Sequence, residues 1–265
     1  MSETPQPAET KPAATILLLR DEPQFEVLMV KRHHQIDFAS GALVFPGGKT
    51  HGGDLDAGWA EHCTGWERFD DEQRSLRIAA IREAYEEAGI LLAERLDGSD
   101  FAEASDPQMR SAVDRGEAAF IDVVRELGVR LRLDALSVFA RWITPTMMPK
   151  RFDTWFYAVR APADQVAAAD GREAVDAEWI APQEVLRLAD AGERTVIFPT
   201  RMNVQLLAEA NSAQDCVARA EARALVPVLP QVEVRDGARF LVLPPDAGYG
   251  PVAEAMERTQ LAMKV

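Results

Sequence analysis

The sequence predicts an α/β fold, because stretches with the pattern of strands lie on both sides of one long amphipathic helix. Two short apolar runs, residues 14–20 and 25–31, are separated by a polar Asp-Glu-Pro sequence and predict a hairpin of two strands. Two stronger strand patterns follow at 136–143 and 154–159. The helix is predicted over 71–88. A chain of 265 residues with 47% hydrophobic residues has room for one large domain with additions.

The remaining elements are predicted in chain order as follows: a strand at 41–45 that ends at Pro46-Gly47-Gly48, a short strand at 177–180, helices at 182–191, 199–210 and 213–222, and a hairpin at 233–241 with an Asp-Gly turn. Residues 1–12 are predicted to be a disordered leader. Residues 13–245 are predicted to form the domain, and 246–265 a C-terminal tail for which we expect a helix.

Two stretches interrupt these elements and are interpreted as insertions. Residues 49–70 are expected to form a loop with a short helix at about 56–63, which Trp59, Trp66 and Phe69 anchor to the domain. Residues 91–135 contain two amphipathic segments, near 108–115 and 116–127, which are expected to cover the core as helices.

The central helix carries clear signals for its ends. Asp70 is predicted to be its N-cap, with Gln73 three residues later, and Gly89 is predicted to end it. Its apolar stripe consists of Ile78, Ile81, Tyr85 and Ala88. We therefore expect the helix to pack by one face and to present its glutamates on the opposite side.

Three of those glutamates form the candidate site. Glu83, Glu86 and Glu87 lie three and four positions apart, so they share one stretch of helix surface, and Arg82 is four positions before Glu86. Clustered carboxylates repel one another unless cations lie among them. Oxygen ligands of this kind suit a hard divalent ion such as Mg²⁺. The alternative is an ordinary solvated helix face.

The segment 82–90 (REAYEEAGI) matches the pattern Arg-Glu-U-x-Glu-Glu-x-Gly-U, where U is apolar, at every fixed position. It resembles the second half of the Nudix box, and the sequence FPGGK at 45–49 resembles the entry to the first half. The resemblance runs from about 13 to about 245. It implies a Nudix-type α/β/α sandwich with a mixed sheet, and an activity that cleaves nucleoside diphosphate derivatives with Mg²⁺ or Mn²⁺.

The resemblance also implies roles for individual residues. Glu83, Glu86, Glu87 and the carbonyl of Gly48 are the implied metal ligands, and Arg82 is implied to position Glu86. The general base is left open between Glu173 and Glu178, which lie in the later loop region.

The box is split in this chain. Gly48 and Arg82 are 34 positions apart, which is 20 more than in the uninterrupted box. Counting back from Arg82 places Arg74 where the family has a glutamate, so we expect that carboxylate to be missing, with Asp71 or Glu72 as substitutes only if the helix start shifts. A split at this place resembles a subgroup related to the peroxisomal coenzyme A diphosphatases of animals.

Coenzyme A-cleaving relatives carry a spaced pattern before the box. This chain keeps the spacing with Arg32, Gly41 and the Phe45-Pro46-Gly47-Gly48 run, but Asp37 stands where an arginine is usual. The implied substrate-binding residues are Arg32, Gly41, Gly47, Gly48 and Arg151. Further phosphate contacts are considered for Lys31, Lys150 and Arg201, each of which is equally well explained as a solvated cation. Trp142 and Trp155 are weighed as adenine-stacking residues, although packing in the core is the commoner role.

Three functional classes remain. The favoured one is hydrolysis of coenzyme A or acyl-coenzyme A to 3′,5′-ADP and (acyl-)4′-phosphopantetheine. The alternatives are a pyrophosphatase for another nucleoside diphosphate derivative, such as an ADP-sugar or a dinucleotide, and a non-catalytic nucleotide-binding protein.

The resemblance implies a small-molecule diphosphate substrate as the partner, and composition argues against other classes. The net charge of −14 argues against nucleic acid, and no run approaches the ~18 apolar residues of a membrane span. Cys63 and Cys216 are interpreted as reduced thiols of a cytoplasmic protein. A homodimer is an open expectation.

Overall fold

The structure is a computed structural model that describes residues 8–33 and 41–259. Its main sheet is built from β1 (Thr10–Arg20), β2 (Glu26–Arg32), β3 (Leu43–Val44), β4 (Gly47–Lys49), β8 (Ser137–Ile143), β9 (Arg151–Arg160) and β10 (Ala174–Ile180). The strand order is β10-β2-β1-β9-β8, with β3 paired to β2 and β4 paired to β1. β1 and β9 run parallel and the other pairs run antiparallel, so the sheet is mixed, as predicted.

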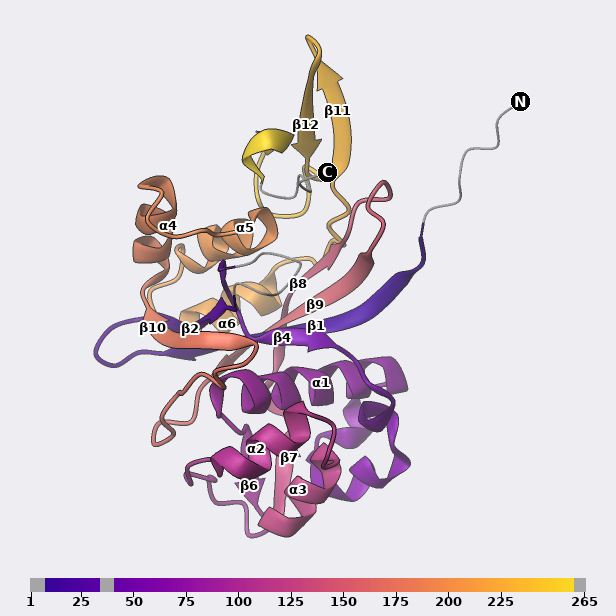
Figure 1. Cartoon of the computed structure of the whole chain (residues 1–265), viewed down its shortest axis with the longest axis vertical. Coiled ribbons are helices and arrows are strands. Elements are labelled where there is room, and N and C mark those ends of the chain that lie inside the picture. The colour runs from indigo at the N-terminus through magenta and orange to yellow at the C-terminus, as the bar shows by residue number, and fades with distance from the viewer. Residues whose placement is uncertain (1–7, 34–40, 260–265) are drawn as a thin grey trace.

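Helices cover both faces of this sheet (Figure 1). One face carries α1 (Asp71–Ala88). The other carries α4 (Pro182–Asp190), α5 (Phe198–Leu207) and α6 (Ala213–Ala222). The predicted α/β/α sandwich is therefore confirmed, and each of these helices agrees with its predicted range to within three residues at either end. No helix within the described ranges is both long and apolar enough to cross a membrane.

The two insertions fold together beneath α1 (Figure 1). The first contains the 3₁₀ helices η1 (Gly52–Leu55), η2 (Ala57–His62) and η3 (Trp66–Arg68) and the strand β5 (Cys63–Thr64). The second contains β6 (Ala93–Arg95), α2 (Pro107–Asp114), α3 (Phe120–Leu127), β7 (Val129–Arg132) and η4 (Leu133–Ala135). The strands of both join in one small sheet, in the order β5-β7-β6. The sequence predicted the two helices of the second insertion but not this sheet.

The aromatic anchors of the first insertion are packed as predicted. Trp59 is 1% exposed and stacks at a tilt on Phe120 of α3, with 5.6 Å between ring centroids. Trp66 and Phe69 are partly buried against the same core. The short helix expected at 56–63 forms, although as a 3₁₀ helix.

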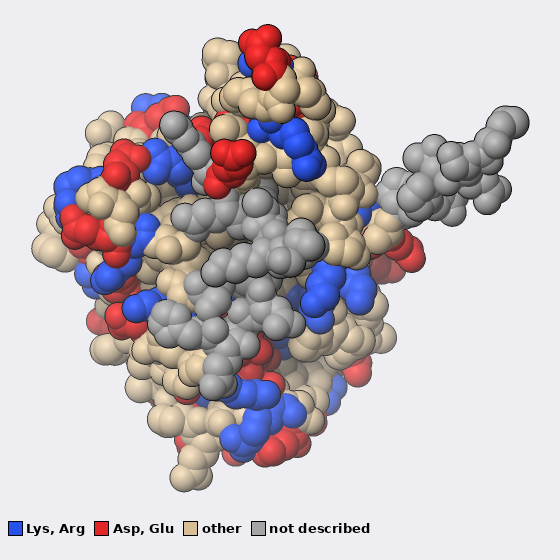
Figure 2. Space-filling model, turned by 45° about the horizontal axis from the view of Figure 1, so that its top comes forward, with Lys and Arg blue, Asp and Glu red and all other residues tan. Residues whose placement is uncertain are grey.

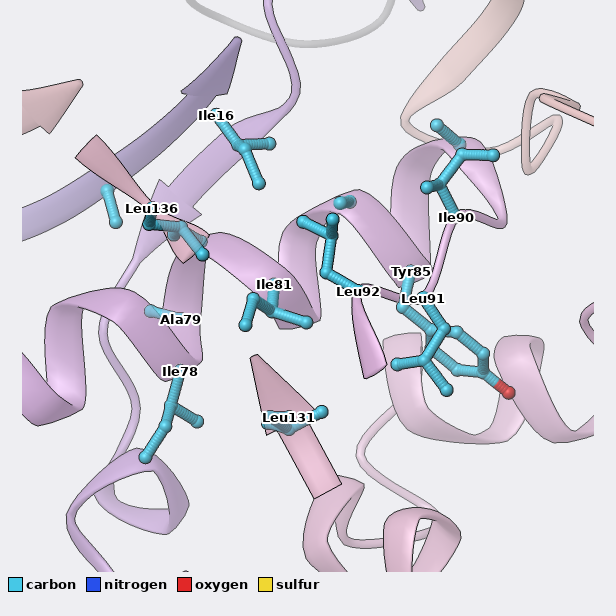
Figure 3. Packing of buried hydrophobic residues seen from close by; sticks show 14 of the residues in the cluster. Ile16, Ile78, Ala79, Ile81, Tyr85, Ile90, Leu91, Leu92, Leu131 and Leu136 are labelled. Carbon is cyan, nitrogen blue, oxygen red and sulfur yellow. The ribbon is translucent and has the colours of Figure 1, made fainter. Parts of the chain in front are cut away.

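The central helix has the predicted ends but not the predicted exposure. The side chain of Asp70 accepts a hydrogen bond from Gln73 N at 2.8 Å, and Gly89 ends α1 with φ 71°. Every residue from Ser75 to Ala88, which is all of α1 except its first turn, is buried. Figure 3 shows why: α1 lies between Ile16 of β1 on one side and Leu131 of β7 on the other. The expectation of a helix that packs by one face only was therefore wrong, because the insertions cover the face away from the sheet.

Both ends of the chain depart from their predictions. β1 begins at Thr10, inside the predicted leader, because Thr10–Pro12 pairs in parallel with Arg151–Asp153 of β9. The tail adds the strand β13 (Ala253–Ala255) and the 3₁₀ helix η5 (Met256–Arg258) in place of the expected helix. β13 completes a small sheet with β11 (Gln231–Arg235) and β12 (Ala238–Val242), whose predicted Asp-Gly turn is confirmed. Residues 1–7 and 260–265 lie outside the described ranges.

Lys and Arg side chains and Asp and Glu side chains both form small groups on the face shown in Figure 2, among uncharged residues.

Candidate active site

The candidate site lies where β4 crosses α1. Gly47 pairs with Thr15 of β1, and a Cβ atom at Gly47 would lie 2.6 Å from the carbonyl oxygen of Ala14. A Cβ atom at Gly48 would collide with the carboxylate of Glu83. A Cβ atom would thus press Gly47 against the main chain of β1, and Gly48 against the Glu83 side chain of α1, so glycine permits both close approaches.

Arg82 is the centre of the buried charges. Its Nη1 donates to Glu83 Oε1 at 2.8 Å and to Glu86 Oε2 at 3.1 Å. On its other side, Nε and Nη2 donate to the two carboxylate oxygens of Asp54 at 3.0 and 3.1 Å. Nη2 also donates to the carbonyl oxygen of Lys49 at 2.9 Å. The predicted contact with Glu86 is therefore present, and Arg82 binds Glu83 and Asp54 as well.

Asp54 corrects the prediction that an orienting carboxylate is missing. It is 3% exposed and also accepts a hydrogen bond from His51 N at 2.7 Å. Asp54 lies six positions after Gly48, which is the family spacing when the box is counted forward from its glycine. The extra residues thus follow this position. A forward count would have found Asp54 in the sequence.

Arg74, which the backward count placed at that position, has a structural role at the start of α1. Its guanidinium lies 4.5 Å from the ring centroid of Trp66 and forms an ion pair with Asp71 at 2.7 Å. Asp71 is 89% exposed at its side chain, so neither residue belongs to the buried charges around Arg82.

Burial dominates the electrostatics of the three glutamates. Desolvation raises the pKa of Glu83, Glu86 and Glu87, and the charge of Glu83 raises the pKa of Glu87 further. Burial lowers the pKa of Arg82, but the carboxylates of Glu83, Asp54 and Glu86 outweigh it and the net pKa is raised. Because the single guanidinium of Arg82 is shared among several carboxylates, it does not offset the effect of burial, and the pKa values of the three glutamates stay raised.

The residues present fit a hard divalent cation in their chemistry. Across the described ranges, no group of three or more His, Cys, Asp or Glu side chains is arranged so that it could hold a metal ion. Glu83 and Glu87 nevertheless both approach the β4 main chain: Glu83 lies against Gly48, and Glu87 Oε2 accepts a hydrogen bond from Gly47 N at 3.2 Å. Their oxygens are the ligand type that Mg²⁺ and Mn²⁺ take, and a cation there would offset the raised carboxylate pKa values.

Two further charged residues, Glu173 and Arg32, are near enough to influence the pKa values of these glutamates. Burial has the largest effect on the pKa values of Glu83 and Glu87. The charge of Glu173 makes a smaller contribution that raises both pKa values, whereas the charge of Arg32 lowers the pKa of Glu87. Glu173 is exposed, and its carbonyl oxygen accepts a hydrogen bond from His33 N at 2.8 Å. Glu178, the other candidate base, lies inside β10 and is 3.7 Å from Arg194. Position therefore favours Glu173 over Glu178.

The predicted substrate-binding residues are only partly brought together. Nε of Arg32 is buried without a hydrogen-bond partner, close to Glu87. Gly41 occupies a turn before β3 with φ 69°. Arg151, the first residue of β9, instead donates to the carbonyl oxygens of Thr144 at 3.0 Å and Ala8 at 2.7 Å. It therefore joins two main-chain segments at the start of β9.

Other sequence candidates lie elsewhere. Arg201 forms an ion pair with Asp190 at 2.6 Å in the layer of α4 and α5. Trp142 is 5% exposed and packs edge-on against Phe198, so its ring has no open face for an adenine. Trp155 is partly covered by the guanidinium of Arg141 at 4.8 Å. Asp37 lies outside the described residues.

Comparison with known proteins gives consistent matches. The model of the NUDT19 Nudix domain matches residues 67–205. Acyl-coenzyme A diphosphatase NUDT19 of Xenopus laevis is 27% identical over 205 residues, which cover 61% of this chain and 54% of the frog protein. The human protein of the same name is 29% identical over 245 residues, covering 74% of this chain and 65% of its own. The chain thus spans about half to two thirds of the length of these relatives.

A solved structure supports the same fold. The crystal structure of a NUDIX hydrolase from Alicyclobacillus acidocaldarius superposes with a TM-score of 0.67 at 25% sequence identity. The superposition covers 80% of this chain and 96% of that chain. The predicted sandwich is therefore of the type found in that protein.

Proposed function

The chain belongs to the Nudix hydrolase family and is a Nudix hydrolase, and from that premise we propose that it cleaves the diphosphate bond of coenzyme A or acyl-coenzyme A. The products would be 3′,5′-ADP and (acyl-)4′-phosphopantetheine. Nudix hydrolases use divalent metal ions, and we propose Mg²⁺ or Mn²⁺ here. The observation that carries the proposal is the set of buried carboxylates on α1 packed against the Gly47–Gly48 main chain.

We assign the metal to the carboxylates of Glu83 and Glu87, with Glu86 and the Gly48 carbonyl as further ligands. When bound, the metal supplies positive charge that neutralises the diphosphate oxygens and polarises phosphorus. Arg82 keeps Glu83 and Glu86 in place through its bonds of 2.8 and 3.1 Å, and Asp54 fixes Arg82 from the opposite side. Hydrogen bonds to Arg82 thus keep the carboxylates of Glu83 and Glu86 in position for a metal ion.

We propose Glu173 as the general base. Its carboxylate is exposed, while its main chain is fixed: Asp170 accepts hydrogen bonds from the N–H groups of Glu173 at 2.9 Å and Ala174 at 2.7 Å. A carboxylate oxygen of Glu173 would accept the proton of the attacking water. As the new oxygen–phosphorus bond forms, the bond from that phosphorus to the bridging oxygen breaks.

Coenzyme A is favoured as the substrate by the names of the relatives and by Arg32. A buried Nε without a partner is a donor that a phosphate oxygen could satisfy, and a charge-assisted contact contributes about 1.5–3 kcal/mol. We expect kcat/KM for coenzyme A to exceed that for 3′-dephospho-coenzyme A by roughly 10- to 150-fold. Arg32→Ala should narrow the gap by lowering the rate on coenzyme A more than the rate on 3′-dephospho-coenzyme A.

The measurement is product chromatography on a substrate panel with Mg²⁺ or Mn²⁺. Arg160→Ala is the matched control, because Arg160 is exposed and pairs with Leu19 at the far end of β1 from the Gly48 pairing. Equal rates on coenzyme A and its dephospho form would contradict recognition of the 3′-phosphate. Faster cleavage of ADP-ribose than of either would transfer the assignment to another nucleoside diphosphate derivative.

A cytoplasmic location and a homodimer stay predictions.

A further inference from the structure

The helix that carries the glutamates ends among them, and its last carbonyl groups need partners. A helix C-terminus leaves carbonyl oxygens without intrahelical donors and carries the negative end of the helix dipole. At the end of α1, Gly89 N donates a hydrogen bond to Tyr85 O at 3.0 Å, and Ile90 N donates one to Ala84 O at 3.2 Å. The carbonyl groups that follow must be bound from outside the helix.

Segments far away in the sequence supply those bonds. The guanidinium of Arg110 in α2 donates from Nε to Glu86 O at 2.7 Å. Ala168 N donates to Ala88 O at 2.9 Å, and the hydroxyl of Ser105 donates to Gly89 O. Of these three groups, only Arg110 brings a charge.

Arg110 is built tightly into this position. It is 7% exposed, and a Cβ atom at Gly89 would lie only 3.0 Å from its Nη1. Asp106 caps the start of its helix by accepting from Gln108 N at 2.7 Å, and Asp114 at the end of the helix forms an ion pair with Arg172 at 2.7 Å. The guanidinium thus lies buried against the last turn of α1, bonded to it through Nε, while Nη2 is buried without a hydrogen-bond partner.

A cation at this point opposes two negative fields. One is the dipole end of α1, and the other is the charge of the three glutamates in its last two turns. Arg110 contacts the peptide carbonyl of Glu86, which belongs to the turn that presents Glu87 to Gly47. A shift of that carbonyl would move both side chains.

We propose that Arg110 is a positioning residue for the glutamates of α1, reaching the site from the second insertion through the main chain of Glu86. This proposal rests on the proposed function, because it assumes that those glutamates bind the metal. It adds a residue that lies outside the box and 24 positions after Glu86. The second insertion thereby takes part in catalysis without touching the substrate.

The test combines metal binding with kinetics. Arg110→Met removes the charge and the bond to Glu86 O, and Arg110→Lys keeps the charge. Arg115→Gln is the matched control, because Arg115 follows the same helix but is exposed and bonded to Glu117. Mn²⁺ binding is measured by electron paramagnetic resonance of the free ion without substrate. Loss of an outer partner of metal ligands typically weakens affinity or activity ~10- to 100-fold.

For Arg110→Met we expect Mn²⁺ affinity and kcat to fall ~10-fold or more, with KM changed less than ~3-fold. Arg110→Lys should recover part of both, and Arg115→Gln should match the wild type. A folded Arg110→Met protein with wild-type Mn²⁺ affinity and kcat would overturn the proposal, as would equal losses in Arg115→Gln. If coenzyme A is not cleaved, the Mn²⁺ isotherm and the rate on the best diphosphate of the panel still decide the role of Arg110.

Discussion

The two helical layers on either side of the sheet differ in the polar side chains that they bury. In the described part of the chain, the layer of α1 and the insertions buries these charged side chains: Asp54, Arg77, Arg82, Glu83, Glu86, Glu87 and Arg110. Among the described residues of the opposite layer, which contains α4, α5, α6 and the segment after them, the buried polar residues are all uncharged, namely Thr200, Asn203 and Thr259. The same sheet thus supports one layer with buried charges and one without.

The buried polar groups of the second layer satisfy one another. Trp142 Nε1 donates to the hydroxyl of Tyr249 at 2.9 Å, and that hydroxyl donates to Asn203 Oδ1 at 2.8 Å. The amide of Asn203 then donates to Pro199 O at 2.9 Å. Such a neutral chain costs little to bury because every member has a partner.

The charged layer follows a different principle. Its carboxylates outnumber the guanidinium groups that contact them, and burial raises the pKa of each of the three glutamates. Residues arranged in this way destabilise the fold unless a further cation is bound. The comparison indicates that the neutral layer is arranged for stability and the charged layer for binding a cation. A substitution in the charged layer should therefore lower activity without lowering stability, and one in the neutral layer should lower stability without lowering kcat.

Glu87→Gln tests the charged layer and should have the largest effect. We expect turnover to fall at least ~100-fold, equivalent to about 2.7 kcal/mol of transition-state stabilisation, because one metal ligand is lost. Thermal stability without metal should stay equal or rise, since the substitution removes one of several repelling charges. Steady-state kinetics across metal concentrations and thermal unfolding are the measurements. Glu184→Gln on α4, in the opposite layer and with a side chain that is 45% exposed, is the control. Near-full activity of Glu87→Gln at all metal concentrations would exclude Glu87 as a ligand.

Asn203→Ala tests the neutral layer. It removes the acceptor of the Tyr249 hydroxyl proton and the amide donor to Pro199 O, while the bond from Trp142 Nε1 to that hydroxyl is kept. A buried polar group that loses its partner costs about 1–3 kcal/mol. We expect unfolding free energy to fall by about 2 kcal/mol while kcat per folded molecule stays at the wild-type value. Denaturant titration and active-site-normalised kinetics measure the two quantities. A fall in kcat at unchanged stability would mean that this layer also shapes the active site.

Local signals allowed much of this architecture to be predicted. The range of α1 follows from Asp70 and Gly89, which act on neighbouring backbone groups and need no tertiary contact. The Asp236-Gly237 turn was equally predictable, since both residues adopt the positive φ that the turn requires. The glutamates and Arg82 were found for the same reason, because helical spacing alone brings them together.

What the sequence did not reveal depends on contacts between distant segments. The periodicity of α1 identifies an apolar stripe, but it contains no information about the insertions that cover the other face. Asp54 and Arg110 contact α1 from 28 and 24 positions away, so helical spacing could not identify them. For Asp54 a signal did exist, in the forward count from Gly48, whereas Arg110 belongs to no motif.

Asp54→Asn has the smallest expected effect and tests whether the box carboxylate has been relocated or lost. The substitution keeps the size of the side chain but removes the charge that binds Nε and Nη2 of Arg82, so Arg82 would hold Glu83 and Glu86 less firmly. We expect kcat to fall ~10-fold, equivalent to about 1.4 kcal/mol, as is typical for a partner behind metal ligands. Asp54→Glu should retain most of the activity, because it restores the carboxylate. Asp71→Asn is the control at the position that a backward count favours, and it should leave kcat unchanged because Asp71 is solvated. If Asp71→Asn reduced kcat and Asp54→Asn did not, the orienting carboxylate would lie at the start of α1 and the forward count would be wrong.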